Sequence, residues 1–307
     1  MPDRLRSLVA QELAMPADPR AAAMAVGLAA RYPQAARAVL FYGSCLREEN
    51  LDGRMLDFYL IVSAYRAAYA KKWLATANRL VPPNVFPFEH RGLIAKYAVL
   101  SEADFARLCS LEADNVSVWA RFAQPSRLLW AADDLARQRA VAAIASAAPT
   151  LLELTMPMMP PGTAPGILEL WKTGFTLTYN AELRAERKGR SFSIVDGDPD
   201  RYERFGLAAL EEIARQRGVG PHGEVTGVLA PDQAARRWRT LQRRGKWLSV
   251  VRLAKASFTY TGGIDYLAWK INRHAGTAIE IKPWQRRWPL IGALTLLPRL
   301  FRGGAIR

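Results

Sequence analysis

Cysteine and histidine are scarce in this chain of 307 residues, and their scarcity excludes several kinds of site. The two cysteines, Cys45 and Cys109, are too few for a disulfide framework or a zinc cluster. The three histidines stand far apart, with no spacing typical of metal ligands: His90, His222 and His274. We therefore expect a protein of a reducing compartment, in which Cys45 fills space within a loop.

Long apolar runs are also missing. The longest uncharged apolar stretch near the C-terminus extends only from Trp288 to Pro298. A membrane-spanning helix needs ~20 such residues, so no spanning window is expected. The N-terminus carries Asp3 and Glu12 and has no apolar core segment, so no secretory signal is expected.

Acidic residues are scarce in the last quarter of the chain. Residues 231–307 contain 16 Lys and Arg but only three acids, so they carry +13 of the net charge of +15. The rest of the chain is nearly balanced. Such a basic region predicts an anionic partner, which is either a nucleic acid or an acidic membrane surface.

Apolar residues are abundant, at 50% of the chain, which is enough for a sizeable core and about two domains. Near-continuous apolar runs of strand length predict a sheet that is covered on both faces. Strands are expected at residues 38–42, 56–63, 92–100 and 126–130. Helices are expected at residues 3–14, 19–31, 64–80, after the cap at Ser101, and at 167–188.

The chemistry begins where the first apolar run ends, in Gly43-Ser44, and Asp57 opens the next run. Glycine lets a triphosphate approach the backbone, serine and N–H groups bind its oxygens, and a strand-borne carboxylate holds Mg²⁺. This order is typical of nucleotidyl transfer, and it requires Gly43 and Asp57 to converge on one polyphosphate. A second carboxylate is expected two positions after Asp57, where Tyr59 stands. Other candidate ligands are Glu48, Glu49, Asp52, Glu89 and Glu182.

Several segments resemble one family in the same order along the chain. Residues 41–48, 55–58 and 92–101 are similar to the mitochondrial-type CDP-diacylglycerol synthases, the translocator assembly and maintenance phosphatidate cytidylyltransferases. Residues 121–125 and 177–184 resemble two further segments of that family, and 250–253 and 259–264 do so more weakly. The chain departs from the family at Cys45, where a glycine is usual, and at Ser63-Ala64, where an acidic pair is usual.

The resemblance implies a Mg²⁺-dependent enzyme that joins CTP and phosphatidate into CDP-diacylglycerol and pyrophosphate. A peripheral membrane position agrees with this resemblance, and the richness in alanine and arginine with few lysines indicates a bacterial gene. We therefore expect the cytoplasmic face of a bacterial inner membrane, with an organellar matrix as the alternative. The expected roles are catalysis by Asp57 and Lys96, metal binding by Asp57 and Glu182, nucleotide binding by Tyr42, Gly43 and Ser44, and lipid-phosphate binding by Arg184.

The predicted fold class is therefore α/β (α+β), with a nucleotidyltransferase-like core and a mixed sheet. Residues 1–130 form the expected catalytic domain, 131–230 a helical domain, and 231–307 a basic helical region. Within that region, residues 282–302 place Trp and Arg at both ends of an apolar stretch, which predicts a peripheral membrane anchor.

Two alternatives stay open. One is a nucleotidyltransferase that acts on tRNA or other RNA and uses the basic C-terminal region as its phosphate track. The other is a catalytically silent protein that binds a nucleotide or lipid, which Tyr59 and the missing acidic pair favour.

Overall fold

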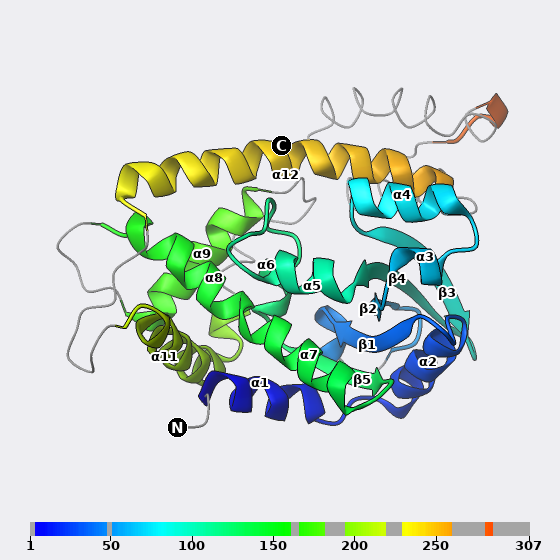
Figure 1. Ribbon diagram of the computed structural model, residues 1–307, viewed down its shortest axis with the longest axis horizontal. Coiled ribbons are helices and arrows are strands. Elements are labelled where there is room, and N and C mark those ends of the chain that lie inside the picture. Colours follow the sequence, from blue (N-terminus) through cyan, green and yellow to red (C-terminus); the bar gives the residue numbers. More distant parts are fainter. Residues whose placement is uncertain are drawn as a thin grey trace.

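A mixed sheet of five strands forms the centre of the protein (Figure 1). The computed structural model describes residues 4–47, 51–160, 166–181, 194–218, 229–259 and 280–284. The strands are β1 (Ala36–Tyr42), β2 (Met55–Val62), β3 (Asn84–His90), β4 (Leu93–Ser101) and β5 (Ser126–Ala131), in the order β3-β4-β2-β1-β5. The pair β2–β4 is parallel and the other pairs are antiparallel, so the predicted α/β class with a mixed sheet is confirmed.

Helices cover both faces of this sheet, as the apolar strands predict. Alternate residues of each strand point to opposite faces, so Leu40 and Tyr59 join one core cluster while Val39 and Phe58 join another. The first face packs against α1 (Arg4–Ala14), α5 (Glu102–Cys109), α6 (Trp119–Phe122) and α7 (Asp134–Ala145). The second face packs against α2 (Pro19–Ala30), α3 (Tyr65–Ala68) and α4 (Lys72–Leu80).

Two features differ from the sequence predictions: strand β3 is present, and α3 and α4 are separate helices. Strand β3 contains Pro87, which cannot donate to a ladder and is tolerated here because β3 is an edge strand. The helix expected at 64–80 is interrupted at Tyr69, whose backbone is extended (φ −122°, ψ 121°). The Tyr69 hydroxyl then reaches inward and donates to Asn78 Oδ1 at 3.2 Å.

The helices after β5 continue the core of the first face instead of forming a separate one. They are α8 (Ala147–Thr155), the short η2 (Met156–Met158), α9 (Ile167–Tyr179), α11 (Pro199–Gln216) and α12 (Pro231–Thr259). Trp171, Tyr202 and Trp238 belong to the same buried cluster as Leu40 of β1. The domain boundaries at residues 130 and 230 therefore stay a prediction.

Helix α9 ends at Tyr179, earlier than the expected residue 188. The backbone carbonyl of Ala181 lies against Gly245 of α12, where a Cβ would stand 2.1 Å from the oxygen. Helix α9 therefore ends close to the point where Gly245 of α12 packs against the chain. Residues 182–188, including Glu182 and Arg184, lie outside the described residues.

One stretch, Asp134–Met158, is long and apolar enough to cross a membrane, although the sequence analysis expects none. It contains the charged residues Asp134, Arg137, Arg139 and Glu153, and 67% of its most apolar window is buried inside the protein. Burial of this kind is usual for the core helices of a folded domain, so length and composition alone carry no argument for a span.

A buried ion pair fastens the N-terminal helix to the helical region. The Arg201 side chain on α11 is 4% exposed and pairs with Glu12 of α1, donating from Nη2 to Glu12 Oε1 at 2.9 Å. Its guanidinium also lies 4.3 Å from the centre of the Phe205 ring. The pair thus joins segments that are 189 residues apart in the sequence.

We expect Glu12→Gln to lower the free energy of unfolding by about 3–5 kcal/mol, because it leaves a buried guanidinium without its counter-charge. Urea denaturation measures this change. The matched control is Glu203→Gln, which removes an exposed carboxylate from α11 and should stay within about 0.5 kcal/mol of wild type. Equal stabilities of the two variants would show that the Arg201–Glu12 pair does not hold α1 in place.

Candidate active site

Three of the expected site residues, Tyr42, Asp57 and Lys96, lie in one row across the sheet. Tyr42 of β1 is the cross-strand partner of Asp57 of β2, and Asp57 is the partner of Lys96 of β4. Ser126 of β5 extends the row beyond Tyr42. Because directly paired residues point to the same face of a sheet, the side chains of Tyr42, Asp57 and Lys96 share the face that α6 covers.

Asp57 and Lys96 form an ion pair at the partly open end of this row. Lys96 Nζ lies 3.1 Å from Asp57 Oδ1, and the two side chains are 34% and 21% exposed respectively. A pair with this much contact with water adds little stability. Both groups therefore remain accessible to a ligand.

Gly43 leaves open the space beside the other oxygen of the same carboxylate. Its φ of +94° lies in a region that side chains disfavour, and a Cβ there would stand 3.2 Å from Asp57 Oδ2. Glycine thus satisfies the turn and leaves space beside the carboxylate. Ser44 follows at the start of the short helix η1 (Ser44–Arg47) and is exposed. Gly43 and Asp57 therefore converge, as the sequence interpretation requires.

Arg121 of α6 is a site residue that the sequence analysis did not assign. The positive charge of its guanidinium acts on the Tyr42 hydroxyl, and the guanidinium donates to the carbonyl of Ser117. Burial raises the pKa of Tyr42 well above its usual value, and the negative charge of Asp57 adds to the shift. Tyr42 is therefore neutral near pH 7 and presents a hydroxyl rather than a phenolate. The only signal in the sequence was the family-like segment 121–125 that contains Arg121.

Tyr59 occupies the position expected for a second carboxylate, and its surroundings explain the difference. The Tyr59 ring is 2% exposed and its centre lies 5.2 Å from the ring centres of both Tyr42 and Phe122. A carboxylate would lose its hydration in this aromatic cluster. Tyr59 instead forms the floor beneath Tyr42.

The two other candidate ligands that the structure describes do not join Asp57. Asp52 is exposed and its Oδ1 pairs with Arg20 Nη1 at 2.7 Å. Glu89 lies on β3, which is separated from β2 by β4. Glu48, Glu49 and Glu182 lie outside the described residues.

The donor set limits which metal could bind. Within the described ranges no group of three or more His, Cys, Asp or Glu side chains gathers into a metal site. Mg²⁺ is commonly held by one or two carboxylates together with substrate phosphates and water. Asp57 therefore fits a Mg²⁺ ion that arrives with a polyphosphate, and these residues do not fit an ion held by the protein alone.

The charges favour an anionic ligand. Lys96 pairs with Asp57, the carboxylate that the described part of the chain brings to this row, and the positive charge of Arg121 acts on Tyr42 beside it. Positive groups beside a glycine turn can hold phosphate oxygens by hydrogen bonds and by ion pairing.

No protein-family model matches the chain, and no curated protein matches it at a significant level. The family resemblance of the short segments therefore stays a prediction.

Proposed function

We propose that the chain is a nucleotidyltransferase that uses CTP and Mg²⁺ to convert phosphatidate into CDP-diacylglycerol. The observation that carries this proposal is what stands beside the two oxygens of the Asp57 carboxylate. Lys96 Nζ lies 3.1 Å from Oδ1, and the space beside Oδ2, where a Cβ at position 43 would stand 3.2 Å away, is left open by Gly43. A carboxylate, a cation and an open glycine turn within one row are the groups that a metal-bound triphosphate requires.

The reaction requires little acid–base catalysis from the protein. The phosphate of the acceptor lipid is already ionised at neutral pH, so its oxygen can attack the α-phosphorus of CTP without a strong general base. The new P–O bond forms as the bond to pyrophosphate breaks. Catalysis then consists of positioning and of neutralising charge, which suits a site made of Asp57, Lys96 and Arg121.

Each side chain has a role in this scheme. Asp57 would hold Mg²⁺, which lowers the charge repulsion around the triphosphate. Gly43 and Ser44 allow phosphate oxygens to approach the backbone, and Lys96 and Arg121 bind oxygens of the donor or acceptor phosphate. Tyr42 stays neutral and leaves the positive charge of Arg121 uncompensated by a phenolate. The expected roles of Glu182 and Arg184 stay predictions.

One observation favours a second function. Asp57 is the single carboxylate that the described part of the chain brings to this row, since Tyr59 is part of the core. A protein with this site could bind a nucleotide without turning it over. CTP binding without formation of CDP-lipid would establish that function in place of the first.

Asp57→Asn should lower turnover on the order of 100-fold or more, the scale of removing one preorganised polar group from a reacting centre. The assay follows CDP-lipid formation from labelled CTP and phosphatidate vesicles with Mg²⁺. Asp52→Asn is the matched control, because Asp52 is exposed, pairs with Arg20 and should leave turnover unchanged. Full activity of Asp57→Asn would remove Asp57 from the site.

Gly43→Ala should weaken binding of Mg²⁺–CTP about tenfold, or roughly 1.4 kcal/mol, because the new methyl group would stand 3.2 Å from Asp57 Oδ2 and take up space that phosphate oxygens need. The positive φ itself should lower stability by about 1–3 kcal/mol. Titration calorimetry measures the affinity, and thermal unfolding measures the stability. Gly53→Ala separates the two effects: Gly53 also has a positive φ (+67°), but no atom would lie within 4 Å of its Cβ. Both variants should lose stability, and only Gly43→Ala should lose affinity.

A further inference from the structure

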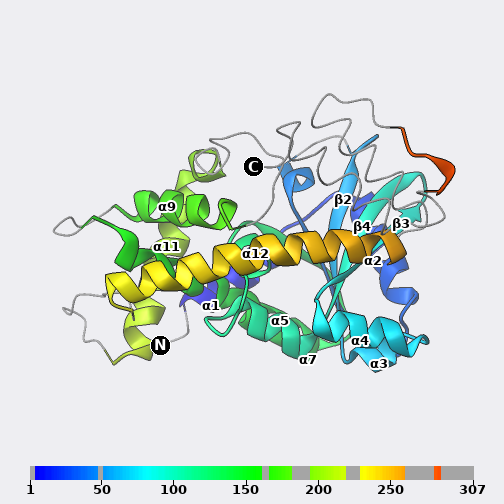
Figure 2. The ribbon, with the colours of Figure 1, turned by 90° about the horizontal axis from the view of Figure 1, so that it is seen from above.

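Helix α12 has two faces with different surroundings (Figure 2). The inward face is buried and packs on the helical region, with Ala234, Trp238 and Leu241 at helical spacing. Trp238 anchors it by donating from Nε1 to the carbonyl of Leu154 at 2.8 Å. The rotation of α12 about its own axis is therefore fixed, and so is the direction of each of its basic side chains.

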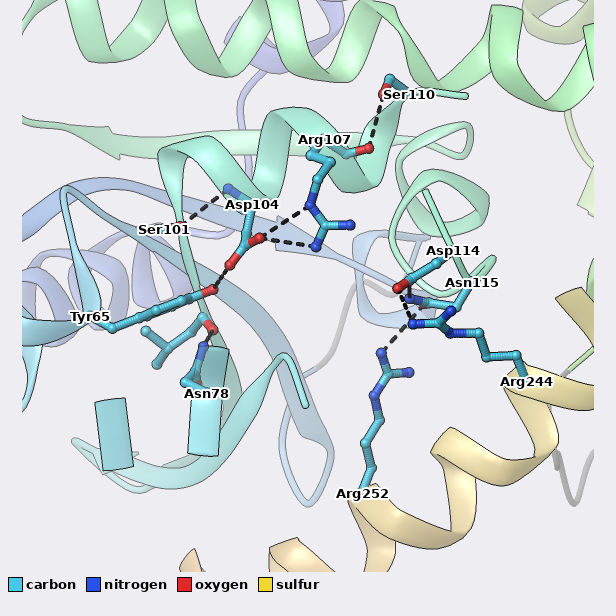
Figure 3. Close-up of polar contacts among 11 residues, drawn as sticks. Tyr65, Asn78, Ser101, Asp104, Arg107, Ser110, Asp114, Asn115, Arg244 and Arg252 are labelled. Carbon is cyan, nitrogen blue, oxygen red and sulfur yellow. Dashed lines mark hydrogen bonds and ion pairs between the residues drawn. The ribbon is translucent and has the colours of Figure 1, made fainter. Parts of the chain in front are cut away.

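Four basic residues of α12 are used to hold the helix to the body of the protein. Arg237 donates to the carbonyl of Ala113 at 2.7 Å, and Arg244 pairs with Asp114 at 2.6 Å. Arg252 reaches the same loop, and Figure 3 shows Arg244 and Arg252 approaching it together. The fourth of these residues is Lys255.

Lys255 and Arg252 also bind the chain just after α4. Lys255 donates to the carbonyls of Val81 and Pro83, and Arg252 donates to the carbonyl of Pro82 at 2.9 Å. Burial lowers the pKa of Lys255 to about 7, with a smaller contribution from Arg252. These cations face protein oxygens and are not available to an outside partner.

The outward face of α12 carries cations of a different kind. Arg239, Arg243 and Lys246 are exposed and recur at helical spacing, and Trp247 beside them is 66% exposed. No hydrogen bond or ion pair joins these three cations to any other part of the chain that the structure describes. On the same face, Arg236 is paired with Asp232 at 2.5 Å.

Helix α4 lies beside the C-terminal half of α12 in both Figure 1 and Figure 2. It exposes two large apolar side chains, Trp73 (50% exposed) and Leu80 (74% exposed). They are seven residues apart and so lie on one side of the helix. Lys72 and Arg79 are exposed next to them. Each of the two helices therefore exposes basic residues next to a tryptophan.

We propose that this surface docks on an anionic lipid bilayer. The α4–α12 face consists of Arg239, Arg243, Lys246 and Trp247 of α12 and Lys72, Trp73, Arg79 and Leu80 of α4. Its cations match the negative potential of acidic headgroups, and tryptophan prefers the boundary between headgroups and acyl chains. The proposal goes beyond the proposed function, because it uses none of the residues of the candidate active site.

The exposed apolar side chains favour a bilayer over a nucleic acid. A surface that binds a nucleic acid needs cations for the phosphates and flat rings that stack on the bases. An exposed Leu80 contributes to neither. At a bilayer surface, Leu80 and the rings of Trp73 and Trp247 all leave water together. This face also differs from the anchor expected at residues 282–302, most of which lies outside the described residues.

The test is co-sedimentation of the full chain with phosphatidylcholine vesicles that contain or lack phosphatidylserine, without nucleotide. The triple variant Arg239→Gln/Arg243→Gln/Lys246→Gln should bind acidic vesicles about 100-fold more weakly, or about fivefold for each charge removed. The control is Arg4→Gln/Arg137→Gln/Arg204→Gln, which removes the same charge from exposed positions on α1, α7 and α11. The control should bind as wild type does, and both variants should keep the circular dichroism of the wild type.

Three results would overturn the proposal. Equal losses in both triple variants would mean that only net charge matters. Unchanged binding of the α12 variant would mean that another surface docks. Salt-sensitive binding of a short RNA through the same three residues, without binding to vesicles, would assign the face to a polynucleotide.

A second measurement reports the depth of contact. Brominated lipids should quench part of the tryptophan fluorescence of the bound wild type, and Trp247→Phe should lower the quenched fraction without weakening the electrostatic attraction. A quenched fraction that Trp247→Phe leaves unchanged would show that α12 does not reach the acyl boundary, which would also overturn the proposal.

Discussion

The register between β1 and β2 is the constraint on which the site depends. It sets Tyr42 opposite Asp57, with Gly43 one residue beyond the strand and against the carboxylate. A slip of one residue would turn Asp57 to the other face of the sheet, away from Arg121. The apolar residues that alternate along the strands with the site residues, such as Phe41 and Phe58, are less than 2% exposed. They prevent the slip, because it would move them out of the core on the opposite face.

The aromatic cluster beneath the row explains why position 59 does not carry a carboxylate. Tyr59 and Phe122 pack against Tyr42, and a charged group among these rings would lose its hydration. A site of this kind relies on positive charge more than on metal ligands, so it suits a substrate that brings its own phosphate oxygens.

The sequence predicts the parts of this structure that local patterns determine. The apolar strands β1, β2 and β4 and the cap of α5 are confirmed, since Ser101 accepts from the Asp104 N–H at 3.2 Å as a serine cap should. Strand β3 was missed because Pro87 looks like a breaker until its edge position is known. Arg121 was missed because its partner Tyr42 is 79 residues away, and no local pattern encodes that contact. The break at Tyr69 likewise depends on the distant packing of its ring.

The directions of the basic residues near the C-terminus also depend on contacts that local sequence patterns do not encode. The sequence establishes that the region is basic, yet only the packing of Trp238 and Gly245 decides which cations turn inward. Arg244 and Lys255 then hold protein oxygens, while Arg239 and Arg243 point away from the body. A helix fixed in this way cannot turn its outward cations toward the protein, so they stay hydrated until an anionic surface replaces that water. Because the same rotation that buries Trp238 exposes Trp247, the packing of the core also determines the composition of the docking surface.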